Sequence, residues 1–563
     1  MRKRVVKKGI TVNAIAGTYV VFLGLDIEPK MRKGFRGFAI KREDHTEGET
    51  IWLRGLKTFE AVEPTPAQGE TFSSYKHPIQ GFQWSDYSAK AGYDYTYTIC
   101  CMYGPVDDVK PKYQVSVSVT TEVEDIGKGH SVFFNRGSVA TQEYARKFLN
   151  KKPKDVGPAA YEWLSRGMLE SIIRFIDKAK KGDSIFGAVY EFQWPAIYDA
   201  LKNAKSRGVK VDIIYDATEG KKGPFERNEE GIEIAKIKSI TSPRKNGKLM
   251  HNKFFIHSRG DKNLAVLTGS TNQTENGLYG HSNLVHIVED KQVANAFKDY
   301  WDRLKEDPAI AKEYRDANMD ATPVLETLPK GTTVIFSPRG TKLDSLDWYA
   351  KLASEAKGAL LMTFAFGMHQ KFKDVFSNDD DILKMALMEK AYAPAVKEKD
   401  TKAIQKIRNR PNVIIAIGNR IATNAFDRWL REIDRIIPTL HVHWIHTKYM
   451  IIDPIGPNPI IVSGSANYSK ASTDTNDENM LLIKGDKRVA DIYFGEYLRL
   501  FNHYSFRESV KRALDLKEIG VAEEWTPQFL ETKDSWMDDY FNDTNDKTAR
   551  FARRVYFSGP MSE

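Results

Sequence analysis

Apolar and polar residues alternate along the first 128 positions of the chain, in short stretches separated by turn residues. A period of two is typical of a strand that buries one face, and this region contains no run with the period of a helix. The clearest strand candidates are GFAIKRE from Gly37, TIWLRGL from Thr50, YDYTYTICCMYG from Tyr93 and YQVSVSVTTEVE from Tyr113. The pattern therefore predicts an all-β unit over residues 1–128.

The number and type of these strands favour a β-sandwich. About seven short strands fit this length, and the tyrosine-rich run from Ala91 to Tyr97 resembles the corner strand of fibronectin type III and immunoglobulin-like sandwiches. The longest apolar stretch, Ile10 to Leu25, follows the basic start MRKRVVKK and is open to two interpretations, a signal peptide or a strand. We expect a strand, because Asn13 and Thr18 interrupt the stretch, β-branched residues dominate it and no small-residue cleavage site follows.

From about Ser131 the pattern changes to strands that alternate with amphipathic helices, which is typical of an α/β domain. SIFGAVYEF predicts a buried strand, PAIYDALKNAKSRG a helix that ends at Gly208, and VKVDIIYDA the next strand. Past Asp320 the pattern restarts. Segments of the first half correspond to segments of the second: VFFNRG to VIFSPRG, SIFGAVYEF to ALLMTFAFG, VKVDIIYDA to NVIIAIGNR, KFFIHS to KYMIID, and VANAFKDYWDRL to VADIYFGEYLRL. The chain therefore carries an internal duplication.

The predicted fold is α/β. Two duplicated α/β/α lobes, residues 129–325 and 326–505, are expected to form a pseudo-twofold core behind the β-sandwich of residues 1–128. A helical extension, residues 506–563, is expected to pack on this core. Its aromatic residues are predicted to cap the core of one lobe; they are Trp536, Tyr540, Phe541, Phe551 and Phe557.

Composition limits the class of protein. The chain has 563 residues, of which 41% are hydrophobic and 28% charged, as in soluble proteins of several domains. Its two cysteines, Cys100 and Cys101, are adjacent, which excludes a disulfide framework and a cysteine-based zinc site. A cytoplasmic location fits, with a secreted or periplasmic one left open. The formal net charge of +9 favours a polyanionic partner, nucleic acid or anionic phospholipid, although charge spread thinly over a large surface is the alternative.

One short constellation occurs twice. His251-Asn252-Lys253 precedes Gly269-Ser270-Thr271-Asn272, and His446-Thr447-Lys448 precedes Gly464-Ser465-Ala466-Asn467, with eighteen positions from each histidine to the glycine. A neutral imidazole can attack a phosphodiester and later leave, while a second, protonated imidazole donates its proton to the departing oxygen. Two lysines and two asparagine amides can hold the other phosphate oxygens. No metal ion or other cofactor is needed, because the lysines supply the positive charge.

This pattern, H-x-K-x-x-x-x-D followed by G-S-x-N in two copies, closely resembles the phospholipase D superfamily over residues of about 130–505. The second copy is complete and ends at Asp453, a structural position, whereas the first carries Ser258 there. We expect the first half to stay active, because this aspartate does not attack the substrate in the family. The resemblance implies a phosphohistidine intermediate and catalytic roles for His251, Lys253, Asn272, His446, Lys448 and Asn467. Ser270 and Ser465 are expected to support the substrate phosphate.

The two copies differ eleven positions after the motif asparagines, where Glu478 stands in one and Asn283 in the other. In the family, polar residues at this place bond the motif histidines. If the pairs cross between the lobes, Glu478 activates His251 as the nucleophile and Asn283 orients His446 as the acid; if they stay within each lobe, the roles invert. We expect the crossed arrangement.

Other polar residues carry no clear signal. His257, His281, His286, His441 and His443 are expected to be ordinary structural residues. The basic segment Lys236–Lys248 has two interpretations, a strand edge or loop that follows a polyanion and a solvated hairpin, and Arg420 is expected at the surface.

Three functions compete. The first is a metal-independent nuclease for DNA or RNA, for which nucleic acid is the expected partner. The second is a phospholipase D or phosphatidyl transferase acting on phospholipid headgroups, and the third is an inactive binding scaffold. The sandwich is expected to bind a protein partner or a membrane. One chain holds the complete site, so the sequence leaves the oligomeric state open.

Overall fold

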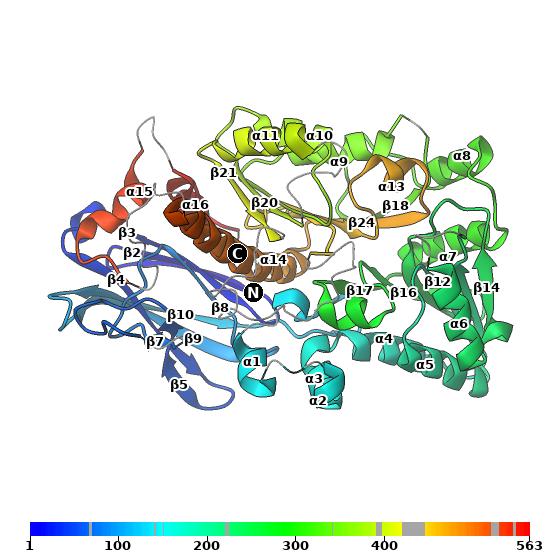
Figure 1. Ribbon diagram of the computed structural model, residues 1–563, viewed down its shortest axis with the longest axis horizontal. Helices are drawn as coiled ribbons and strands as arrows, with labels where there is room; N and C mark the ends of the chain where they lie inside the picture. Colours follow the sequence, from blue (N-terminus) through cyan, green and yellow to red (C-terminus); the bar gives the residue numbers. More distant parts are fainter. Residues whose placement is uncertain are drawn as a thin grey trace.

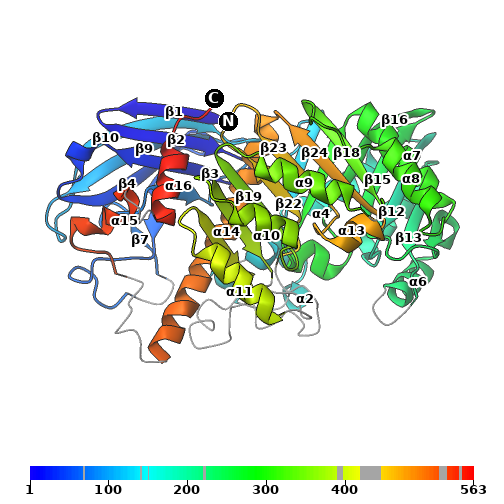
Figure 2. The ribbon, with the colours of Figure 1, turned by 90° about the horizontal axis from the view of Figure 1, so that it is seen from above.

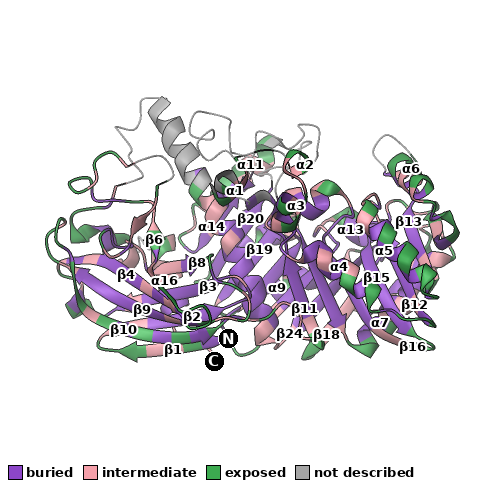
Figure 3. Ribbon diagram, turned by 90° about the horizontal axis from the view of Figure 1, so that it is seen from below, coloured by how far each residue is buried: buried purple, intermediate pink, exposed green. Residues whose placement is uncertain are grey.

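The computed structural model describes residues 1–66, 70–139, 142–149, 151, 153–219, 224–340, 342–389, 397–418, 445–518, 529–543 and 548–562. Figure 1 shows a β-rich unit at one end of the molecule and two α/β lobes beside it. Strands fill the interior of each unit, and the burial colours of Figure 3 show the central strands of the lobes as mostly buried, whereas β1 and β10 of the N-terminal unit are partly exposed. The predicted α/β class is confirmed.

The N-terminal unit consists of two four-stranded sheets. The first is β1 (Arg2–Lys7), β2 (Ile10–Ala16), β3 (Val21–Ile27) and β8 (Gln83–Asp86), and the second, in order, is β10 (Lys110–Thr120), β9 (Asp94–Tyr103), β4 (Phe35–Asp44) and β5 (Glu49–Trp52). A short ribbon, β6 (Arg54–Gly55) with β7 (Phe72–Ser73), stands apart. The stretch from Ile10 to Leu25 forms the antiparallel pair β2–β3, so it is two strands where one was predicted.

The two lobes have sheets of identical strand order, as a duplication requires. The first sheet is β11 (Gly129–Phe134), β17 (Leu284–Glu289), β16 (Lys262–Gly269), β15 (Lys253–Arg259), β12 (Asp183–Val189), β13 (Lys210–Asp216) and β14 (Thr241–Arg244). The second is β18 (Gly331–Ser337), β24 (Glu478–Lys484), β23 (Ile460–Gly464), β22 (Tyr449–Ile452), β19 (Ala359–Phe364), β20 (Leu383–Met388) and β21 (Val413–Ile417). Every strand of one lobe therefore has a counterpart in the other.

This strand order corrects one correspondence that was drawn from the sequence. The strand β13, which contains VKVDIIYDA, matches β20 and not the segment NVIIAIGNR, which forms β21 and matches β14. The reason is the connection between these strands, which carries different helices and loops in the two lobes. Apolar composition alone did not distinguish two neighbouring buried strands.

Helices cover both faces of each sheet. The first lobe has α1 (Gln142–Phe148), α2 (Pro153–Val156), α3 (Pro158–Ser165), α4 (Met168–Asp177), α5 (Pro195–Ser206), α6 (Phe225–Ala235) and α7 (Lys291–Lys305). The second has α8 (Lys312–Ala321), α9 (Asp344–Ser354), α10 (Gln370–Ser377), α11 (Lys397–Arg408), α13 (Lys470–Asp474) and α14 (Lys487–Glu518). The helix α14 passes through the boundary predicted at residue 505 and contacts β21 of its own lobe and β2 of the sandwich (Figure 2).

The C-terminal segment, with α15 (Asp538–Phe541) and α16 (Ala549–Ser558), joins the sandwich to α14. The Trp536 ring stacks on Phe82 with centroids 5.7 Å apart, inside the sandwich core, whereas Phe557 lies 5.6 Å from Phe494 of α14. The prediction that the aromatic residues cap the core of one lobe is therefore wrong for Trp536, Tyr540 and Phe541, which pack in the sandwich. Gly24 of β3 has to be glycine, because a Cβ atom there would collide with the Phe557 carbonyl. None of the described helices is long and apolar enough to cross a bilayer.

Candidate active site

The two motif histidines lie where the lobes meet, each just before a central strand, β15 or β22. The backbone N–H of His251 donates to the Asp477 carbonyl at 2.9 Å, and the N–H of His446 donates to the Ser282 carbonyl at 3.2 Å. Each histidine is thus held by the lobe to which it does not belong. Because these backbone groups are buried and paired, the position of each histidine depends on the other lobe.

The side-chain partners cross the interface in the same way. Nδ1 of His251 lies 2.9 Å from Oε2 of Glu478, and Nδ1 of His446 lies 2.9 Å from Oδ1 of Asn283. Of the two arrangements that the sequence left open, the structure has the crossed one. All four side chains are buried.

These hydrogen bonds determine which ring nitrogen of each histidine is available. An ionised carboxylate only accepts, so the Glu478 bond places the proton of His251 on Nδ1. The amide of Asn283 donates to the Gly277 carbonyl at 2.8 Å, so its oxygen faces His446 and again requires a proton on Nδ1. In both rings Nε2 is left for the substrate.

The two motif lysines occupy equivalent positions. Each ammonium donates to the carbonyl of its own histidine at 2.6 Å, Lys253 to His251 and Lys448 to His446. Burial lowers the pKa of Lys253 to about 7, against the nearby Glu478, and burial together with Lys253 holds the pKa of Lys448 well below its ordinary value. Two buried ammonium groups with lowered pKa values are stabilised in their charged form when an anion binds between them, so they are suited to hold a phosphate.

Burial also determines the charge of the histidines. It lowers the pKa of His251 to about 4, although Glu478 opposes the shift. Burial and the charge of Lys448 hold the pKa of His446 well below its ordinary range, and Lys253 and His251 of the other lobe add to this effect. Burial would raise the pKa of Glu478, but His251 beside it holds that carboxyl below its usual value. The site at neutral pH therefore contains neutral imidazoles and an ionised Glu478.

The Gly-Ser pairs of the motif have structural roles. A Cβ atom on Gly269 or Gly464 would collide with the carbonyl of Leu284 or Asn479 on the neighbouring strand. Ser270 is fully buried and donates to Oδ1 of Asn283 at 2.8 Å.

Ser465 is likewise fully buried and accepts from the N–H of Asn479 at 3.0 Å. Ser270 and Ser465 thus fix the segments that carry the partners of the histidines, and their expected support of the substrate phosphate stays a prediction.

The motif asparagines differ in their surroundings. Asn272 donates to Oε2 of Glu191 at 2.6 Å, whereas the backbone N–H of Asn467 donates to Ser472 at 3.1 Å. The side-chain oxygen of each asparagine is buried and lacks a protein partner among the residues that the structure describes. Two such oxygens at matched positions can accept hydrogen bonds from a substrate.

The structure explains why the first motif tolerates Ser258. Asp453 accepts from the backbone N–H groups of Lys357, Gly358 and Ala359, at the start of β19, and so fixes that turn. In the first lobe Asp183, at the start of β12, accepts from the N–H of Lys180 at 3.0 Å. The carboxylate has moved to the neighbouring strand, which agrees with a structural role for the motif aspartate.

Sequence reasoning missed a pair of acidic residues behind the histidines. Asp216 accepts from the N–H of Met250 at 2.6 Å, and Glu389 accepts from the N–H of Ile445 at 2.9 Å. Each stands at the carboxyl end of a matched strand, β13 or β20, and fixes the residue just before a motif histidine. Their equivalence became visible only with the correct match of β13 to β20.

His281 was predicted to be an ordinary structural residue, but it lies beside a motif histidine. Its ring lies 5.7 Å from that of His446, and its charge contributes to the low pKa of His446. The other candidates are structural: His257 bonds Asp183 and His286 bonds Tyr493. The predictions for His441, His443 and Arg420 lie outside the described residues.

The basic segment Lys236–Lys248 contributes to the interface between the lobes. Arg244 is fully buried and donates from Nε to Asp477 at 3.1 Å and from Nη1 to Asp307 at 2.7 Å. This arginine is therefore not available to follow a polyanion. Within the described residues, no three His, Cys, Asp or Glu side chains converge as they would to hold a metal ion.

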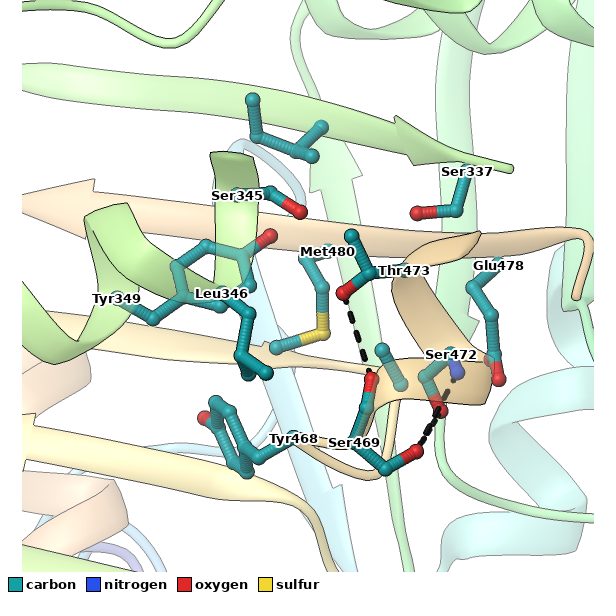
Figure 4. A pocket seen from close by; sticks show the side chains of 12 residues that line it. Ser337, Ser345, Leu346, Tyr349, Tyr468, Ser469, Ser472, Thr473, Glu478 and Met480 are labelled. Atoms are coloured by element: carbon teal, nitrogen blue, oxygen red, sulfur yellow. Dashed lines mark hydrogen bonds between the residues drawn. The ribbon is translucent and has the colours of Figure 1, made fainter. Parts of the chain in front are cut away.

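A cavity of about 10 Å3 lies beside Glu478 in the second lobe (Figure 4). Hydroxyl groups dominate its lining, among them those of Ser337, Ser345 and Ser469. This volume suits a single water molecule, because the hydroxyl groups of the lining can serve as its hydrogen-bond partners.

Comparison with known proteins agrees with this geometry. The family model described as "Cardiolipin synthase, PLD-like domain" matches residues 172–305 and 387–500. A phospholipase D of Rickettsia conorii is 30% identical over 140 residues, which is 24% of this chain and 62% of that relative, so the match spans less than two thirds of its length.

Two solved structures are also similar. Phosphatidylserine synthase of Haemophilus influenzae gives a TM-score of 0.42 at 13% identity and covers 62% of this chain and 91% of its own. Nuc of Salmonella typhimurium gives a TM-score of 0.21 at 26% identity and covers 24% and 84%. The matched family model, the curated relative and the paired motifs make this chain similar to members of the phospholipase D superfamily.

Proposed function

We propose that this protein cleaves phosphodiester bonds without a metal ion, through a covalent phosphohistidine on His251, and that its substrate is a nucleic acid. The observation that supports this most is the crossed and unequal pairing of the histidines, His251 with the carboxylate Glu478 and His446 with the amide Asn283. A carboxylate stabilises the positive charge that a nucleophilic imidazole acquires, whereas an amide orients a ring and adds no charge.

In the first step Nε2 of His251 attacks phosphorus, and the bond from phosphorus to the leaving oxygen breaks. His446, protonated once the anionic substrate is bound, gives its proton to that oxygen. In the second step neutral His446 takes a proton from water, which attacks phosphorus and releases His251. Lys253 and Lys448 stabilise the charge of both transition states.

The net charge of +9 supports a nucleic acid as the substrate, since phosphate backbones bind basic proteins through counterion release. A second candidate is transfer or hydrolysis of a phospholipid headgroup. Phe366, which is 40% exposed just after β19, supports that alternative, as do the names of the curated relative and of the family model. A cytoplasmic location and a partner for the sandwich stay predictions.

Two experiments test the proposal. Single-stranded DNA, RNA and phospholipid vesicles are each incubated with the protein in excess EDTA, and cleavage of nucleic acid alone is expected. A requirement for added magnesium would contradict the mechanism. The roles are tested by acid-quenched trapping with radiolabelled substrate: His446→Ala is expected to accumulate a phosphoenzyme and His251→Ala to form none. A phosphoenzyme in His251→Ala would reverse the assignment.

A further inference from the structure

The two lobes present different side chains at one matched position beside the active site. In the first lobe Val189 pairs with Lys253 in the β12–β15 ladder, so Tyr190 and Glu191 follow immediately after the level of that lysine. In the second lobe Met362 pairs with Met450, which places Phe364 opposite Lys448. Counting on from there, Phe366 stands where the first lobe has Glu191.

The position in the first lobe is polar and directly connected to the site. Glu191 accepts from Asn272 at 2.6 Å, and its charge acts on the pKa of Lys253. The ring of Tyr190 lies 5.0 Å from that of His251. Arg227 lies 3.6 Å from Glu191, but its side chain is 61% exposed, so this pair is weak and the carboxylate stays able to bind a ligand.

The position in the second lobe is apolar. Ala365, the counterpart of Tyr190, is buried and leaves no ring beside His446, where His281 of the other lobe lies instead. Phe366 is one of the few large apolar side chains of the described chain that are more than one third exposed. An exposed aromatic ring next to a phosphate site can stack on a planar group or contact an apolar chain.

We infer that Glu191 and Phe366 determine which phosphodiesters bind and in which orientation. The substrate arm over the first lobe carries an amine or hydroxyl group that Glu191 can bind, and the arm over the second lobe presents a planar or apolar group to Phe366. This inference rests on the proposed function, because it assigns the two ester groups of the same phosphate.

The test uses methyl esters of three phosphates that differ only in the other ester group: phosphocholine with a cationic group, thymidine 5′-phosphate with a planar one, and ethyl phosphate with neither. Glu191→Gln keeps a group that can bond Asn272 but removes the charge. It is expected to lower kcat/KM for the choline ester about fivefold more than for the ethyl ester, as removal of a partly exposed ion pair does. Phe366→Ala is expected to lower kcat/KM for the thymidine ester about tenfold, the loss of one stacked base.

Matched controls remove the same groups elsewhere: Glu226→Gln removes an exposed carboxylate of α6, and Ile234→Ala an exposed apolar side chain. Equal losses for all three esters in Glu191→Gln and Phe366→Ala would overturn the inference. Binding of phosphocholine and thymidine 5′-phosphate is measured by calorimetry in parallel. Variant-specific losses of binding without turnover of any ester would support the inference and refute the proposed function alone.

Discussion

Replacement of Glu478 by glutamine tests whether charge, and not orientation alone, separates the two halves of the site. Glutamine has the size of glutamate, and its amide oxygen can still accept the Nδ1 proton of His251. The change therefore keeps the ring tautomer and removes one negative charge, 2.9 Å from Nδ1 and almost completely buried. The matched change in the other half is Asn283→Asp, which adds a carboxylate beside His446.

The magnitude follows from the burial of this pair. Opposite charges about 4 Å apart interact by roughly 4 kcal/mol at an effective dielectric constant of about 20. The amide retains part of that as a neutral hydrogen bond of about 1 kcal/mol. A loss of about 3 kcal/mol is expected in the transition state, where His251 becomes cationic, and this corresponds to roughly a 150-fold slower formation of the phosphoenzyme.

Rapid-quench kinetics under single-turnover conditions separate the two steps. In Glu478→Gln the formation of the phosphoenzyme is expected to slow far more than its hydrolysis. In Asn283→Asp the rate of phosphoenzyme formation is expected to fall less than in Glu478→Gln. The new carboxylate stands beside His446, which loses its positive charge in that step, and not beside the nucleophile His251. A decrease of less than threefold in Glu478→Gln, or a defect confined to hydrolysis, would refute the electrostatic role of Glu478.

Three further predictions concern the anion site and the fold. Sulfate, which does not titrate near neutrality, is expected to bind more weakly as the pH rises above 7, by up to about tenfold per pH unit. The reason is that Lys253, with a pKa of about 7, has to be protonated to hold the anion. A constant affinity from pH 6.5 to 8.5, measured by calorimetry, would contradict this. Asp453→Ser, which copies the first motif, is expected to lower the free energy of unfolding by about 2 kcal/mol through the loss of three backbone contacts and to leave kcat within threefold, so a large loss of kcat would give Asp453 a role in the reaction. Gly464→Ala is expected to destabilise the protein by about 2–3 kcal/mol in urea unfolding because its Cβ meets the Asn479 carbonyl, whereas Gly55→Ala, where nothing lies within 4 Å, is the control.

The periodicity was sufficient to predict the fold class, and the repeated motif identified residues that the structure brings together. Strand alternation predicted the β-rich N-terminal unit, and the matched His, Lys and Asn positions predicted two half-sites. The correspondence of β13 to β20 was missed because buried parallel strands are uniformly apolar, so their composition does not distinguish one from its neighbour. The burial of Ser270 and Ser465 was also missed, since a small polar side chain suits a strand interior as well as a substrate pocket.

Residues that act across the lobe interface were the hardest to predict. His281, which lies beside His446 of the other lobe, carries no motif signal. The same holds within the first lobe for Glu191, which meets Asn272 only in the folded chain. The crossed pairing of Glu478 and Asn283 was predicted from the family resemblance, since sequence spacing alone leaves it open. The local sequence shows which side chains are present, but which of them contact one another depends on how the two lobes pack.

The arrangement has a consequence for how the site evolved its asymmetry. Because each histidine takes its backbone support and its side-chain partner from the opposite lobe, a substitution near one motif alters the histidine of the other. Glu478 thus changes the chemistry of His251 while the sequence of the first motif stays the same. His281 likewise changes the surroundings of His446 while the sequence of the second motif stays the same. A duplicated chain with pairs confined to each lobe would need changes within the motif to separate the roles. With crossed pairs, the two motifs can stay nearly identical while nucleophile and acid diverge, which is the pattern that this chain shows.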